Sequence, residues 1–123
     1  STALDLHRFC CMLLNEGNLD GITILSPSSV QQMLSNQNQP PLSTRGLGWD
    51  FKDVVSGYWS CGFLFPPGAV GHTGFTGTSI WFDPLNQWIA VVLTNRVHLS
   101  RDGNLAAMHQ FRPRLHNLLL SMV

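Results

Sequence analysis

The segment from residue 78 to residue 95 constrains the fold more than any other part of the chain. Residues 78–83 (TSIWFD) and 87–95 (QWIAVVLTN) are rich in β-branched and aromatic side chains, and a DPLN turn separates them. This pattern predicts an antiparallel hairpin. Every residue from 88 to 93 is apolar. A strand of this kind is expected inside a sheet that is covered on both faces.

Helical spacing dominates the start of the chain. Residues 2–15 carry apolar side chains at helical intervals, with Leu6, Phe9 and Leu13 on one stripe that Cys10 and Leu14 widen. Thr2 and Asp5 form a capping-box pattern with Asp in place of Glu, and Gly17 marks the end of the helix. A second helix is expected after Ser26, a suitable N-cap that precedes a proline at the first helical position.

A third helix is expected from residue 105 to the end of the sequence. Its predicted apolar stripe consists of Leu105, Met108, Leu115, Leu118, Leu119 and Met122. Pro113 is expected to kink or restart this helix.

Between the helical ends, residues 36–44 indicate a loop, and residues 46–51 and 58–65 have short strand character. Two early helices, a set of antiparallel strands and a terminal helix predict an α+β fold.

The composition limits what the chain can bind. It is 44% hydrophobic and only 11% charged, less than half the usual charged fraction, so it has little with which to cover a complete surface. Seven basic and seven acidic residues are spread along the sequence, which argues against nucleic acid as a partner. The apolar runs are too short to cross a bilayer, so no membrane partner is expected. The compartment is not indicated.

The three cysteines do not form a disulfide framework. Cys10 and Cys11 are adjacent in a helical pattern and would point apart, and Cys61 leaves the count odd. We interpret all three as small buried hydrophobic residues.

The stretch 70–84 (VGHTGFTGTSIWFDP) carries the best candidate for chemistry. His72 and Thr73 could bind a substrate carboxylate or assist proton transfer, and Gly74 would let a substrate backbone approach the strand. The backbone N–H of the residue that follows would then be free to donate to an oxyanion. The alternative is a tight strand entry in which His72 is an ordinary surface residue.

Several motifs occur together and in a familiar order: the helix STALDLHRFCCMLLN, ILSPSSV, GLGW, GHTGFTGTSIWFDP and VVLTNR. In this arrangement the chain resembles the C-terminal half of the serine β-lactamase and penicillin-binding-protein-like hydrolases. The resemblance is to the class C-like group, which includes family VIII esterases and D-amino-acid peptidases. It implies that residues 1–123 are a C-terminal segment of one serine hydrolase domain with a β-lactamase/transpeptidase-like fold.

The resemblance also assigns roles at the triplet. The family's Lys-Thr-Gly triplet lines the active site, and His72, Thr73 and Gly74 match it with His in place of Lys. The resemblance implies that His72 and Thr73 orient substrate and handle protons, and that the Phe75 N–H belongs to the oxyanion hole. Because histidine is largely uncharged at pH 7, the replacement weakens recognition of a β-lactam carboxylate and favours an esterase or a peptidase.

The family's Ser-x-x-Lys and Tyr-x-Asn motifs are not in this sequence, because neither Lys52 nor Tyr58 has the required neighbours. We therefore expect the nucleophile in an N-terminal half outside this chain, and we expect the chain alone to be inactive. The whole enzyme would cleave an ester or amide through an acyl-serine intermediate. The competing hypothesis is a non-catalytic binding or interaction module that retains the fold without its nucleophile.

The remaining candidates are weaker. His98 could line the same cleft and contact substrate, or it could be a solvated loop residue. His109 and His116 are seven residues apart and could share a helix face, but the sequence has no H-E-x-x-H motif and no suitably spaced carboxylate. We therefore expect no metal and no cofactor. We interpret the four tryptophans as core or cleft wall. Four arginines are interpreted as surface residues or members of local ion pairs: Arg96, Arg101, Arg112 and Arg114.

The expected partners are a small ester, amide or peptide substrate and a second polypeptide. The resembled family pairs the far edge of strand 88–95 with strands from the N-terminal half. We therefore expect that edge to pair with the N-terminal half of the same protein or with a second copy of the chain.

Overall fold

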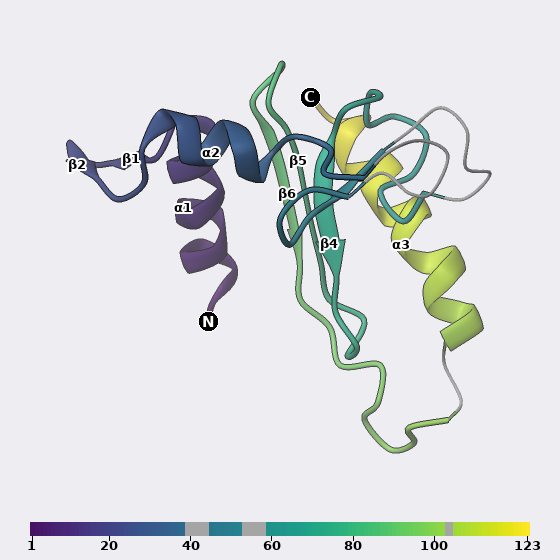
Figure 1. Cartoon of the computed structure of the whole chain (residues 1–123). Coiled ribbons are helices and arrows are strands. Elements are labelled where there is room, and N and C mark those ends of the chain that lie inside the picture. The colour runs from purple at the N-terminus through teal and green to yellow at the C-terminus, as the bar shows by residue number, and fades with distance from the viewer. Residues whose placement is uncertain (39–44, 53–58, 103–104) are drawn as a thin grey trace.

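A four-stranded antiparallel sheet lies at the centre of the computed structural model, with helix α1 on one face and helix α3 on the other (Figure 1). The structure describes residues 1–38, 45–52, 59–102 and 105–123. Its helices are α1 (Ala3–Leu14), α2 (Pro27–Met33) and α3 (Leu105–Leu120). Its strands are β1 (Asn18–Leu19), β2 (Ile22–Thr23), β3 (Asp50–Phe51), β4 (Val70–Thr73), β5 (Ser79–Asp83) and β6 (Trp88–Val92). The predicted α+β fold is confirmed.

The first helix begins and ends where the sequence predicts. The backbone N–H of Asp5 donates to Thr2 Oγ1 at 3.1 Å, and the Asp5 carboxylate accepts from the Thr2 N–H at 2.9 Å. The hydrogen bonds that the carboxylate accepts from the Thr2 N–H and from Thr2 Oγ1 lower the pKa of Asp5. Gly17, with φ of +90°, donates to the Met12 carbonyl at 2.8 Å and turns the chain away. At α2, Ser26 accepts from the N–H of Ser29, as its predicted N-cap role requires.

The predicted hairpin is β5 and β6, joined by the turn at 84–87. The central sheet has the order β3-β4-β5-β6, and Trp81 lies opposite Gly71 on one side and Ala90 on the other. β6 is shorter than predicted, because it ends at Val92 and Leu93 is already 45% exposed.

Two apolar cores lie on opposite faces of this sheet. The core under α1 consists of Cys10, Met12, Leu13, Val30, Trp49, Val70 and Phe82. The core under α3 consists of Cys61, Phe65, Ala69, Trp81, Ala90 and Leu120. Ile89 packs on the first core while Ala90 belongs to the second, so both faces of β6 contact a core, as predicted.

The cysteines are free thiols. Burial raises the pKa of both Cys10 and Cys61 to about 12, so these thiols behave as small apolar groups, as the sequence indicated. Cys11 is only half-buried and lies 3.6 Å from a ring nitrogen of His7.

The strand expected over 58–65 is wrong for the described residues 59–65, which form turns. Side chains replace the partner strand there. Lys52 Nζ donates to the carbonyls of Phe63 and Phe65, and Asn117 Oδ1 accepts from the Phe63 N–H at 2.8 Å. Gly62, with φ of +78°, breaks the extended backbone. The strand expected over 46–51 is confined to β3. Tyr58 and residues 39–44 of the expected loop lie outside the described residues.

The C-terminal helix departs from prediction in two ways. It continues through Pro113 without interruption. Its buried residues are Met108, Arg112, His116 and Leu120, spaced four apart, whereas several residues of the predicted stripe are exposed. Leu105 is 52%, Leu118 59% and Met122 75% exposed. The face of α3 that packs on the sheet is therefore partly polar.

Candidate functional site

The His-Thr-Gly triplet lies where β4 leaves the sheet. His72 and Thr73 are the last residues of β4, and their side chains point to opposite faces. His72 shares the face of Val70 and is exposed, and its imidazole makes no hydrogen bond to the residues that the structure describes. Thr73 is half-buried on the α3 side. The exposed imidazole at the end of a strand is therefore accessible to a bound molecule.

A tight turn begins at the last residue of the triplet, and we name residues 74–77 the HTG turn. The N–H of Gly74 donates to the Thr78 carbonyl at 2.8 Å, and the N–H of Gly77 donates to the Gly74 carbonyl at 3.0 Å. A Cβ on Gly74 would collide with Thr78 Oγ1. Gly77 has φ of +94°, and a Cβ there would lie 2.5 Å from Thr94 Oγ1. A side chain at Gly74 would therefore displace the Thr78 hydroxyl, and at Gly77 the positive φ and the contact with Thr94 both favour glycine.

Arg112 reaches the HTG turn from α3. Its Nε donates to the Gly77 carbonyl at 2.9 Å, and its Nη2 donates to the Gly74 carbonyl at 3.0 Å. The side chain is only 5% exposed. The expectation that Arg112 is a surface residue is therefore wrong, because its guanidinium is buried and satisfied by backbone oxygens.

Arg96 and Thr94 contact the two middle residues of the HTG turn. Arg96 Nε donates to the Phe75 carbonyl at 2.7 Å, and the Arg96 backbone N–H donates to the Thr76 carbonyl at 2.8 Å. Thr94 Oγ1 adds a third donor, 3.1 Å from the Thr76 carbonyl. With Arg112, every carbonyl of the HTG turn accepts a hydrogen bond from residues that follow β6.

The N–H groups of the HTG turn are disposed differently. Within the part of the chain that the structure describes, those of Phe75 and Thr76 make no hydrogen bond. The Phe75 ring is 59% exposed and carries two guanidinium groups, Arg96 at 4.7 Å and Arg101 at 5.3 Å from its centroid. The turn therefore directs its oxygens inward and has two peptide N–H donors to offer.

His98 lies in the segment that follows β6, two residues after Arg96. Its backbone N–H donates to the Asn95 carbonyl at 3.3 Å, and its side chain is exposed. No hydrogen bond joins it to His72 or Thr73 in the described structure. The segment contacts the HTG turn through Arg96 rather than through His98.

A buried serine and histidine form a second polar pair on the α3 face. Ser79 Oγ lies 2.9 Å from His116 Nε2, and the two residues are 2% and 0% exposed. Burial, with a smaller contribution from Arg112, lowers the pKa of His116 to about 4. Because the pair is neutral at pH 7 and sealed from solvent, it is not a nucleophile–base pair for an external substrate.

Sequence reasoning missed the buried polar residues of α3. The signal that was present is the four-residue spacing of Met108, Arg112, His116 and Leu120, which places all of them on one face. Because two of these four residues, Arg112 and His116, are polar, the apolar pattern of the sequence does not indicate that this face is buried.

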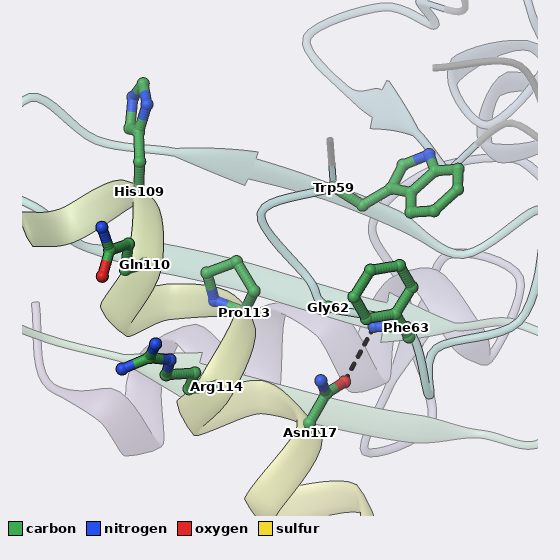
Figure 2. A pocket seen from close by; sticks show the side chains of 8 residues that line it. All are labelled: Trp59, Gly62, Phe63, His109, Gln110, Pro113, Arg114 and Asn117. Carbon is green, nitrogen blue, oxygen red and sulfur yellow. Dashed lines mark hydrogen bonds between the residues drawn. The ribbon is translucent and has the colours of Figure 1, made fainter. Parts of the chain in front are cut away.

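A shallow pocket of about 230 Å³ lies on the other side of α3, against the 59–63 segment. Figure 2 shows its lining: Trp59, Gly62, Phe63, His109, Gln110, Pro113, Arg114 and Asn117. The dashed line there is the bond from the Phe63 N–H to Asn117 Oδ1. None of the site residues predicted from the sequence lines this pocket, so it is separate from the HTG turn.

Two searches of the described residues were negative. No group of three or more His, Cys, Asp and Glu side chains is arranged to bind a metal ion. No described helix is both long and apolar enough to cross a bilayer.

The chain is similar to several known proteins. Proteins of Salmonella paratyphi B, Salmonella newport and Salmonella enteritidis, each named "Putative D-alanyl-D-alanine carboxypeptidase", are 34% identical to the chain over 94 residues. The match covers 76% of this chain and 21% of each relative, so the chain spans about a fifth of their length. The family model described as Beta-lactamase matches residues 1–112. The chain therefore belongs to the beta-lactamase family of serine hydrolases and penicillin-binding-protein-like proteins.

Proposed function

We propose that this chain is the C-terminal segment of a serine hydrolase that cleaves an ester or amide through an acyl-serine intermediate. The observation that carries the proposal is the HTG turn. It begins at Gly74, the last residue of the family triplet, and offers the Phe75 N–H, which makes no hydrogen bond within the described residues. An unsatisfied, fixed peptide N–H beside a substrate is what an oxyanion hole requires.

In this proposal the attacking serine and its base come from the N-terminal part of the full-length protein. The serine oxygen adds to the substrate carbonyl, and the resulting oxyanion accepts a hydrogen bond from the Phe75 N–H. His72 and Thr73 orient the substrate and assist proton transfer, and Gly74 keeps the strand end open. His98 contributes to the cleft wall from the neighbouring segment.

The replacement of the family lysine by His72 bears on the substrate. Histidine, unlike lysine, carries no permanent positive charge, so the replacement weakens recognition of a β-lactam carboxylate and favours an ester or a peptide as substrate. The names of the Salmonella relatives point to peptides that end in D-alanyl-D-alanine as the first peptide substrates to try. Because these peptides also end in a carboxylate, their turnover is to be compared with that of a neutral ester.

The second part of the proposal is assembly with the N-terminal half. Among the described strands, β6 pairs only with β5, so its other edge carries N–H and C=O groups that a further strand can satisfy. We assign that edge to the N-terminal half of the same protein, with a second copy of this chain as the competing partner.

The test is to assay the full-length protein and this chain side by side. We expect the full-length protein to hydrolyse a short-chain chromogenic ester and to be labelled once by a fluorophosphonate. The isolated chain should show neither property, and adding the separately expressed N-terminal half should restore both.

Two results would contradict the proposal. Labelling of a serine within this chain alone would place the nucleophile here. A full-length protein that binds substrates without turnover or labelling would instead support a binding module.

A further inference from the structure

The geometry of one peptide bond links Arg112 to the proposed oxyanion donor. The Gly74 carbonyl and the Phe75 N–H belong to the same peptide unit. In a planar trans peptide the C=O and N–H point in opposite directions. Whichever group fixes the Gly74 carbonyl oxygen therefore also fixes the direction of the Phe75 N–H.

Arg112 is the side chain that fixes the Gly74 carbonyl oxygen. Nη2 lies 3.0 Å from the Gly74 carbonyl oxygen while Nε lies 2.9 Å from that of Gly77, so the guanidinium plane spans both ends of the HTG turn. A lysine ammonium lacks this planar fork and cannot reproduce the two-point contact. The side chain is 5% exposed, and α3 and the sheet limit its movement.

The charge of Arg112 acts on the same peptide. A cation at a carbonyl oxygen polarises the peptide unit and makes its N–H a stronger donor, and the effect is larger where water is excluded. Arg112 would therefore both aim the Phe75 N–H and strengthen it.

Arg96 provides an internal comparison. Its Nε donates to the Phe75 carbonyl oxygen at 2.7 Å. That carbonyl belongs to the Phe75–Thr76 peptide unit, so Arg96 fixes the direction of the Thr76 N–H instead. The two arginines thus act on neighbouring donors, and of the two only Arg112 acts on that of Phe75. The Gly77 N–H also donates to the Gly74 carbonyl, at 3.0 Å, so Arg112 adds a second, charged contact to the same oxygen.

We propose that Arg112 is a positioning residue for the oxyanion hole, acting from α3 through the Gly74–Phe75 peptide unit. It does not touch substrate. This inference rests on the proposed function for its catalytic consequence, but the link between Arg112 and the peptide unit does not depend on it.

The kinetic test uses the full-length enzyme with Arg112→Lys and Arg112→Gln, and with Arg114→Lys as the matched control on the exposed face of α3. Removing an oxyanion donor costs roughly 10²–10³ in kcat. Misaiming it should cost about tenfold to a hundredfold, with KM little changed. The affinity for an aryl boronic acid, whose adduct with the serine carries the oxyanion, should fall in parallel with kcat. A rise in KM alone, or unchanged kcat in both Arg112 variants, would overturn the proposal.

A second measurement does not depend on activity. The backbone amide signal of Phe75 in an NMR spectrum of the full-length protein should move in both Arg112 variants and stay in place in Arg114→Lys. An unmoved Phe75 signal would overturn the inference. A moved signal in a protein that hydrolyses nothing would refute the proposed function while supporting the role of Arg112 in the turn.

Folding of the variants is checked by thermal unfolding. Arg112→Gln retains a donor without a buried charge, so it should fold even if Arg112→Lys does not. If neither variant folds, Arg112 serves the core rather than the turn, and the proposal fails.

Discussion

The two faces of the central sheet are built differently. The α1 face is an apolar core in which Leu13 and Phe82 are almost completely buried. The α3 face has its own apolar core, but the same helix also buries Arg112 and His116. Each of these polar groups contacts a specific atom of the sheet or of the HTG turn.

The two faces therefore make different contributions, one to the stability of the fold and the other to the position of the HTG turn. Apolar side chains pack in many ways at similar cost, whereas a buried polar group is satisfied only when its partner lies at the correct distance and angle. The α1 face therefore contributes mainly free energy of folding, and the α3 face specifies where the HTG turn lies.

The largest expected effect is on the α1 face. Phe82 is 0% exposed and packs edge-on against Trp49, with ring centroids 5.2 Å apart. Phe82→Ala should lower the free energy of unfolding of the full-length protein by about 3–5 kcal/mol, measured by denaturant titration. The control is Phe63→Ala. Because Phe63 is 72% exposed, this substitution should lower the free energy of unfolding by about 1 kcal/mol or less. Equal losses would show that the α1 core is not the main source of stability.

The next effect is a pH dependence from the α3 face. His116 has a pKa of about 4 in the folded protein, against about 6.5 for a free histidine. The unfolded state therefore binds more protons between these values. The contribution of His116 to the free energy of unfolding is fully present above about pH 6.5. It is lost as the pH falls toward 4, and the loss amounts to roughly 3 kcal/mol.

The comparison is made with His116→Gln, which keeps an N–H toward Ser79 and does not titrate. The difference in unfolding free energy between the two proteins should shrink or reverse as the pH falls from 7 to 4.5. Parallel curves for the two proteins would show that His116 is not the group that titrates.

The smallest expected effect on stability belongs to His72, at the solvent-exposed end of β4. His72→Ala should change the free energy of unfolding by less than about 0.5 kcal/mol, because the ring packs against little. In the full-length enzyme it should lower kcat/KM by about 10²-fold, as loss of a positioned acid–base group does. The control is His7→Ala on the exposed side of α1. Unchanged turnover with a large drop in melting temperature would make His72 a structural residue.

Local signals in the sequence were sufficient for some elements. The Thr2–Asp5 capping box and the Ser26 N-cap operate within one turn of helix, so their partners are always nearby in the sequence. The β5–β6 hairpin is likewise encoded by two strand-forming runs and the turn between them. Each of these features appears in the structure close to its predicted bounds.

The HTG triplet was only partly predictable from the sequence. Its residues and their order identified the family, which the comparisons confirm. The structural reason for its glycines could not be derived from the sequence. Gly74 is favoured because Thr78 Oγ1 occupies the position of a Cβ, and Gly77 because of its φ of +94°. Both preferences arise from how the turn closes.

The sequence by itself determined the helix ends, the hairpin and the α+β class, because those depend on neighbours within a few residues. Only the tertiary structure decided which face of α3 is buried, and that Lys52 and Asn117 replace a strand over 59–65. The contact between Arg112 and the Gly74 carbonyl joins residues 38 positions apart. Burial of a charged side chain is favourable only when such a distant partner is in place, and that partner is not encoded in the residues around it.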